Sequence, residues 1–174
     1  MFLRPGFEKS LRHWANRSSY DNIMTYIYDG SIWKLFKEAD DEGSENFFRN
    51  EVADSHLRLM LNLDWFQLFD RTIYSTGAIY AAICNLPCDM QFKRENMLLL
   101  GLLPELNEIS LHKINYYLAP IVNELQLLWS GLTLDRTFKY PQGRKICAAL
   151  ILVSCDIPAA RKICGHISAL VFCH

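Results

Sequence analysis

The amino-acid sequence predicts an α/β protein, in which a meander of three antiparallel strands precedes a crossover helix and a fourth strand parallel to the first. The first observation is the stretch 57–69, LRLMLNLDWFQLF, where apolar and mostly polar residues alternate. The second is the nearly continuous apolar run 145–154, which is typical of a parallel strand covered on both faces. Between them, apolar residues recur with the spacing of an amphipathic helix.

The composition predicts a soluble intracellular protein, nuclear or cytoplasmic, that is neither secreted nor in a membrane. The 174 residues are 51% hydrophobic, enough to bury a core. Eighteen basic and nineteen acidic side chains give a net charge of −1, which argues against a nucleic-acid footprint over the whole surface but allows a local one. No signal segment opens the chain, and its apolar runs are shorter than the roughly 18 residues of a membrane span.

Residues 1–45 form a predicted N-terminal extension. A short helix is expected over 4–17, the most basic segment, and the aromatic-rich stretch 20–36 is expected to pack against the domain. The basic residues are either a DNA-backbone contact or the wet face of a docking helix, and this charge density, ordinary on a helix surface, favours the second interpretation. They are Arg4, Lys9, Arg12, His13 and Arg17. The acidic run 38–45 marks the boundary to a domain over 46–174.

The first strand of that domain has one apolar face. Its odd positions from Leu57 to Trp65 are all apolar, whereas its even positions from Arg58 to Phe66 are mostly polar. Alternation of this kind predicts a strand with one buried face. Asp64 is notable because a charged side chain among the apolar residues of a strand costs free energy, which indicates a functional or pairing role.

Two more strands and a helix are expected next. The segment 73–86 mixes β-branched and aromatic residues and predicts a second strand, although its alanines leave a helix possible. The segment 95–103 predicts a buried third strand, stopped by Pro104. A helix is then expected from Ile114 to Gly131.

Prolines constrain two of the predicted helices. Pro120 requires the helix either to begin near Ala119 or to kink. After a polar loop over 133–143 and the fourth strand, Asp156-Ile157-Pro158 opens a helix that Gly165 would end.

Asp64 and Asp156 both lie near the end of a predicted strand. A right-handed crossover would place the fourth strand beside the first, with the two carboxylates within about 8 Å of each other. Such a pair can share a divalent cation in phosphodiester cleavage, although a third acidic residue is usually needed to fix a second metal. The alternatives are structural. Asp156 before Ile-Pro is a good helix N-cap, and Asp64 could pair with Arg58 or Arg71.

Several motifs, in this order along the chain, resemble the catalytic region of transposases of CACTA (En/Spm-like) DNA elements, especially the fungal branch. The segments RPGF at 4–7 and YDG at 28–30 fit the stretch upstream of that region. The motifs are DWFQLF at 64–69, YSTGAIYAAICNLP at 74–87, ENMLLLGLLP at 95–104, INYYLAPIVNELQLLWSG at 114–131 and SCDIPAARKICG at 154–165.

This resemblance implies a ribonuclease H-like fold and cut-and-paste DNA transposition with Mg²⁺ or Mn²⁺. It implies that Asp64 is the first catalytic acid and metal ligand of a DDE/DDD set and Asp156 the second. The DNA partner would be the transposon ends.

The sequence departs from the family in two ways. Leu68 stands where the family commonly has Pro, and the sequence ends at His174 before the third acidic residue. The apolar C-terminal residues also differ from the polar ends that are usual. We therefore expect a C-terminally incomplete fragment that is inactive alone and can self-associate through the exposed edge of its fourth strand.

The cysteines do not favour zinc. Cys84 and Cys88 are four apart without a second pair, so buried thiols are the better interpretation. A truncated zinc knuckle from Cys164, His166, Cys173 and His174 is also disfavoured, because two of these residues are at the free end. Two other hypotheses remain: a non-catalytic DNA-binding or protein-interaction remnant of a transposon, and an unrelated α/β protein with structural aspartates.

Overall fold

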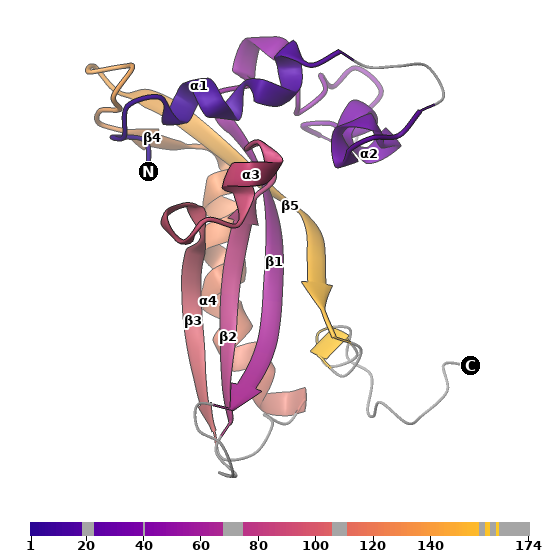
Figure 1. Ribbon diagram of the computed structural model, residues 1–174, viewed down its shortest axis with the longest axis vertical. Coiled ribbons are helices and arrows are strands. Elements are labelled where there is room, and N and C mark those ends of the chain that lie inside the picture. The colour runs from indigo at the N-terminus through magenta and orange to yellow at the C-terminus, as the bar shows by residue number, and fades with distance from the viewer. Residues whose placement is uncertain are drawn as a thin grey trace.

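The computed structural model describes residues 1–18, 23–39, 41–67, 75–105, 111–156, 159–160 and 163. A five-stranded mixed sheet with the order β3-β2-β1-β5-β4 forms the body of the molecule. One long helix, α4, runs along the sheet, and the N-terminal helices gather at one end (Figure 1). The strands are β1 (His56–Gln67), β2 (Ser75–Ile83), β3 (Leu98–Glu105), β4 (Leu132–Leu134) and β5 (Arg144–Cys155).

The helices other than α4 (Leu111–Ser130) are short. Within the described ranges, no helix is long and apolar enough to cross a membrane. The α-helices are α1 (Phe7–Leu11), α2 (Ser31–Leu35) and α3 (Cys88–Gln91), and the 3-10 turns are η1 (His13–Asn16), η2 (Ile27–Asp29), η3 (Asn50–Val52) and η4 (Arg94–Asn96).

The predicted strand order is confirmed. β1 pairs antiparallel with β2, and β2 pairs antiparallel with β3, which together make the three-stranded meander. After α4, β5 lies beside β1 and runs parallel to it, with Leu63 opposite Cys155. Antiparallel neighbours can be joined by tight connections, but a parallel neighbour needs a long crossover, which the segment containing α4 supplies.

One part of the core lies between the sheet and α4. Leu61 and Leu63 of β1 pack in one buried cluster with Ile114 of α4. These β1 residues occupy the odd positions, as the alternating pattern predicts. Gly77 of β2 lies opposite Trp65, and a Cβ at Gly77 would come within 2.9 Å of the Trp65 ring, so only glycine fits there.

The helix α4 ends where the sequence predicts and includes the proline. Gly131 has φ +95°, a left-handed conformation that favours glycine, and its N–H donates to the Leu127 carbonyl at 3.0 Å. The helix begins at Leu111 and contains Pro120, so it does not begin beside the proline.

The structure corrects two details of the sheet. Pro104 does not stop β3, because it lies inside the strand opposite Thr76. It is tolerated because β3 is an edge strand, and for the same reason β3 is less buried than predicted, with Leu99 64% exposed. The second detail is β4, which lies partly in the predicted loop over 133–143 and pairs antiparallel with the start of β5.

Tyr28 and Trp33 pack on the even face of β1, opposite to α4, whereas Phe7 and Leu11 of α1 pack with the odd-position residues of β1. Arg58 of β1 is fully buried, with its guanidinium carbon 2.9 Å from the ring centre of Trp33 and 3.4 Å from that of Phe48. Its Nη2 donates to the Trp33 carbonyl at 2.6 Å. Since no carboxylate pairs with Arg58 in the described part of the chain, the two aromatic rings stabilise its charge. Burial lowers the pKa of this guanidinium to about 7.

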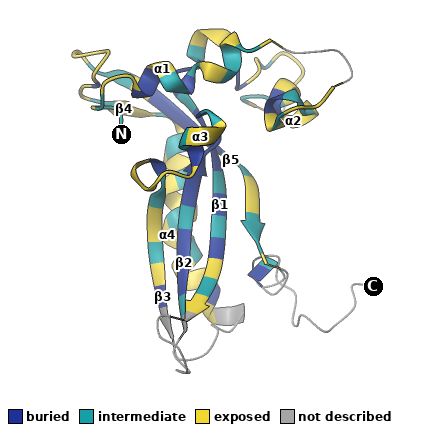
Figure 2. Ribbon diagram, in the orientation of Figure 1, coloured by how far each residue is buried: buried dark blue, intermediate teal, exposed yellow. Residues whose placement is uncertain are grey.

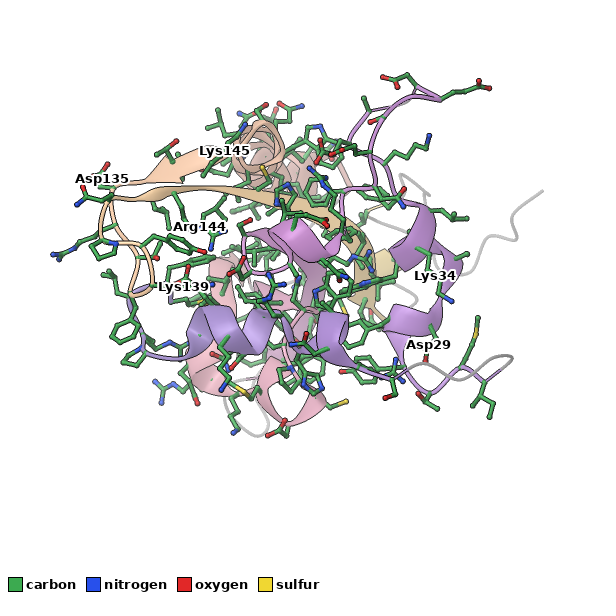
Figure 3. All side chains as sticks on the ribbon, turned by 90° about the horizontal axis from the view of Figure 1, so that it is seen from above. Asp29, Lys34, Asp135, Lys139, Arg144 and Lys145 are labelled. Atoms are coloured by element: carbon green, nitrogen blue, oxygen red, sulfur yellow. The ribbon has the colours of Figure 1, made fainter. Side chains whose placement is uncertain are left out.

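A buried ionic network ties α1 to β5. The carboxylate of Glu8 accepts hydrogen bonds from Arg144 Nη1 at 3.1 Å and from the Lys139 backbone N–H at 3.0 Å. Asp54 accepts from Lys139 Nζ at 2.8 Å and from Arg144 Nη2 at 3.2 Å; Figure 3 shows Lys139 and Arg144 close to α1. Burial opposes the charge of Asp54, but these hydrogen bonds hold the pKa of its carboxyl below its ordinary value.

Candidate metal-binding carboxylates at the end of the sheet

Asp64 lies on the face of β1 opposite to α4. It is exposed, and its Cα is opposite that of Ala78 in β2. The N-terminal residues cover the start of this face, at Arg58 and Met60, but the face becomes more exposed toward the end of β1 (Figure 2). The alternating pattern therefore brings Asp64 to an accessible surface of the sheet.

Asp156 directly follows β5 and caps the next helical turn. Its Oδ1 accepts a hydrogen bond from the Ala159 backbone N–H at 2.8 Å, and its own carbonyl accepts from the Ala160 N–H at 2.8 Å. The N-cap interpretation is therefore correct. The predicted end of this helix, Gly165, lies outside the described residues. Asp156 is exposed, and a carboxylate with one capping oxygen has a second oxygen that can bind a ligand.

The strand register relates the two aspartates. Leu63 and Cys155 are opposite one another on the parallel strands β1 and β5, and each aspartate is the next residue along its chain. Because neighbouring strands are about 4.8 Å apart, this register favours a common surface for Asp64 and Asp156. The separation of about 8 Å between the carboxylates stays a prediction.

A row of three polar side chains lies beside Asp64. Asn62 is opposite Tyr80 of β2 and opposite Ser154 of β5. All three lie on the face of Asp64, because Asn62 precedes it by two residues and paired residues share a face. Burial and then the charge of Asp64 raise the pKa of Tyr80 above its ordinary value.

Asn62 has an unsatisfied side-chain oxygen. Its Oδ1 is buried and has no hydrogen-bond partner. Over the described residues, it is the one buried side-chain acceptor without a hydrogen-bond partner. A buried polar atom without a partner calls for an explanation, and a missing ligand is one.

The donor atoms at this end of the sheet suit a hard cation. Carboxylate, carboxamide and hydroxyl oxygens are the ligands that Mg²⁺ and Mn²⁺ prefer, with water completing the coordination. A ready-made group of three or more His, Cys, Asp or Glu residues suited to a metal is absent from the described ranges. The orphaned oxygen of Asn62 beside an exposed aspartate fits one hydrated cation held at Asp64.

The arginines considered as partners of Asp64 or of DNA mostly make other contacts within the protein or lie outside the described residues. Arg58 is buried between aromatic rings and does not pair with Asp64, and Arg71 lies outside the described residues. In the N-terminal segment, Arg17 pairs with Asp29 at 2.7 Å. Its other arginines also bind within the protein, Arg12 to Asp54 at 3.7 Å and Arg4 to Asn96. These contacts support the docking interpretation of the N-terminal helix.

The two cysteines considered as a pair, Cys84 and Cys88, differ in exposure. Cys84 is buried and Cys88 is exposed. Burial raises the pKa of the Cys84 thiol to about 11, which keeps it protonated and a poor metal ligand at neutral pH. The four residues considered for a zinc knuckle, Cys164, His166, Cys173 and His174, lie outside the described residues.

Sequence reasoning missed the polar row around Asp64. The signal for Asn62 was present in the alternation, since a residue two positions before Asp64 must share its face. Tyr80 and Ser154 had no such signal, because their positions beside Asn62 depend on the register of three strands.

Comparison with protein families identifies a relationship over most of the chain. The model of a family described as "Transposase family tnp2" matches residues 21–173, which is most of the chain. Comparisons with curated proteins and with solved structures found no match.

Proposed function

The chain belongs to the transposase family tnp2, and we propose that it forms the part of a DNA transposase that carries two acids of a DDE/DDD set on a ribonuclease H-like sheet. In this proposal Asp64 is the first catalytic acid and Asp156 the second, as in the CACTA elements that the motifs resemble. The observation that carries it is the register between β1 and β5, with Leu63 opposite Cys155. A meander followed by a parallel fourth strand also supports the ribonuclease H-like fold.

Asp64 and Asp156 would hold Mg²⁺ or Mn²⁺ through their carboxylate oxygens. A bound divalent cation would activate the attacking oxygen or stabilise the leaving oxygen at a DNA phosphodiester. The side chains themselves bind and orient the cation. Asp156 can do so with the oxygen that does not cap the helix.

We expect the 174-residue chain to bind a cation but not to cleave or join DNA by itself. A third acidic ligand is usually needed to fix the second metal, and no three-residue group of that kind occurs in the described ranges. Loss of one member of a catalytic unit can remove most of its rate. Nicking by the purified chain that Asp64→Asn abolishes would contradict this expectation.

One observation favours a second candidate function. The hydrogen bond from Ala159 to Asp156 gives that aspartate a structural role, as expected if the chain is a non-catalytic DNA-binding or protein-interaction remnant of a transposon. The two candidates differ in whether cation binding depends on both aspartates.

The experiment is a titration of the purified chain with Mn²⁺, in which electron paramagnetic resonance measures the concentration of free ion. We expect Asp64→Asn and Asp156→Asn each to weaken binding at least tenfold, because each removes a charged ligand while nearly preserving its shape. Asp135→Asn, an exposed aspartate beyond β4, is the matched control and should leave the affinity unchanged. Equal affinities for all four proteins would overturn the metal-binding role and favour the non-catalytic remnant.

A further inference from the structure

The orphaned oxygen of Asn62 is unusual in its position as well as in its lack of a partner. It lies in the middle strand of the polar row, with Tyr80 on one side and Ser154 on the other, and it precedes Asp64 by two residues. Its Oδ1 is buried without a hydrogen-bond partner. An oxygen of this kind is satisfied either by a cation that it coordinates or by a hydrogen-bond donor, and the distance between Asn62 and Asp64 along β1 favours a donor.

A hydrated divalent cation is a donor of the right size. Residues two apart in a strand are separated by roughly 7 Å along the chain. A water on a cation held by the Asp64 carboxylate would reach across part of this separation and could donate a hydrogen bond to Asn62. Because the cation polarises its waters, they donate strong hydrogen bonds.

We propose that Asn62 is a positioning residue for the cation at Asp64, with its Oδ1 accepting a hydrogen bond from a water of that ion. The inference rests on the proposed function, since it requires Asp64 to hold the metal. Asn62 acts through the bound water and does not itself ligate the ion. Groups that bind the ligands of a metal commonly change its affinity by 10- to 100-fold when they are removed.

This role differs from a structural one in its effect on the metal-free protein. If the Asn62 amide stabilised the fold, its replacement would lower the free energy of unfolding of the metal-free chain. An orphaned acceptor contributes no hydrogen bond to the metal-free fold, so replacing it with an apolar side chain of similar size should be neutral or stabilising. The metal-free stability and the cation affinity should therefore change independently.

The test is Mn²⁺ binding by electron paramagnetic resonance, together with thermal unfolding of the metal-free chain. We expect Asn62→Leu to weaken Mn²⁺ binding at least tenfold while its unfolding midpoint equals or exceeds that of the parent chain. Asn62→Asp keeps an acceptor oxygen and should bind Mn²⁺ at least as tightly as the parent. Asn123→Leu, at an exposed position on α4, is the matched control and should not alter the affinity.

The outcomes separate the inference from the function on which it rests. If Asp64→Asn loses the ion and Asn62→Leu keeps the parent affinity, the role of Asn62 is overturned and the proposed function stands. If Asp64→Asn binds Mn²⁺ like the parent, both are overturned. Should Asn62→Leu fail to fold, Asn62→Ala replaces it, and weaker binding by Asn62→Ala than by Asn62→Asp is the supporting result. Equal binding by those two variants would overturn the role of Asn62.

Discussion

The carboxylate of Asp156 accepts a hydrogen bond from the backbone N–H of Ala159 at 2.8 Å, so this residue begins a helical turn at the end of β5. A cap and a metal ligand depend on different properties of the side chain. The cap needs an oxygen acceptor, which asparagine also provides. A ligand for Mg²⁺ is much better with the full negative charge of aspartate.

Substitutions of Asp156 should separate these two roles. We predict that Asp156→Ala lowers the free energy of unfolding by about 1 kcal/mol, because the Ala159 N–H loses its cap, whereas Asp156→Asn changes it by a few tenths. Both should weaken Mn²⁺ binding. Urea denaturation checks the first effect, with Asp135→Ala as the exposed control. Equal stability of the alanine and asparagine variants would show that the cap contributes little.

Asn85 extends the pairing of β1 beyond the end of β2. It is fully buried, and its Oδ1 accepts from the Arg58 backbone N–H at 2.6 Å while its Nδ2 donates to the His56 carbonyl at 2.9 Å. We predict that Asn85→Ala destabilises the fold by roughly 2–4 kcal/mol, because two buried backbone groups lose their partners. Equilibrium denaturation measures the effect, and the exposed Asn123→Ala should stay within about 0.5 kcal/mol of the parent. A similarly small change for Asn85→Ala would contradict the prediction.

His56 should make the stability depend on pH. Burial lowers its pKa to about 4, against the opposing charge of Glu38, while the positive charges of Arg49, Lys145 and Arg144 lower it further. Above pH 6.5 the ring is neutral in both the folded and unfolded chain, so its contribution is fully present. Between pH 6.5 and about 4, the unfolded chain binds the proton more readily, and the stability falls by an amount on the order of 3 kcal/mol.

The variant His56→Gln isolates this contribution. Other carboxylates also titrate in acid, Asp54 among them, so the informative quantity is the difference between the parent and the variant. We expect the parent to lose more stability than the variant between pH 7 and pH 4.5 in chemical denaturation. Parallel losses in the two proteins would show that His56 does not govern the dependence.

The outer edge of β5 should promote self-association. β4 pairs only with residues 144–146 of this strand, and no other strand of the described ranges covers the remainder. Leu152 and Val153 on this length are 47% and 38% exposed. An uncovered apolar edge strand is a template for pairing with a second chain, and a charge on it opposes such pairing. We predict concentration-dependent oligomers in gel filtration that Leu152→Lys reduces; a monodisperse parent monomer would contradict this.

The sequence was informative where a local pattern decides the structure. Alternation between Leu57 and Trp65 predicts β1 and its buried face, and Gly131 predicts the end of α4, because each depends on neighbouring residues. The short β4 was missed because three residues carry too little periodicity, and Pro104 was taken for a strand end because its edge position depends on the whole sheet.

In the candidate site, too, features set by a local sequence pattern were predicted and features set by the whole sheet were not. Asp64 and Asp156 were predicted from their places near strand ends and from the motifs around them. The polar row was not, because Asn62, Tyr80 and Ser154 come from three strands whose register no local pattern records. For the same reason the aromatic rings around Arg58 were missed, since Trp33 and Phe48 precede it by many residues.

The ionic contact between Glu8 and Arg144 also has a consequence for synthesis of the chain. The two residues are 136 positions apart, so the helix α1 emerges from the ribosome long before its partner. At 5–20 residues per second, the intervening chain takes roughly 7–27 s to make. During that interval Phe7 and Leu11, which are buried in the finished fold, lack the Ile146 side chain that shares their cluster. Nascent chains stalled before Arg144 should therefore leave α1 open to protease, and chains released after β5 should protect it.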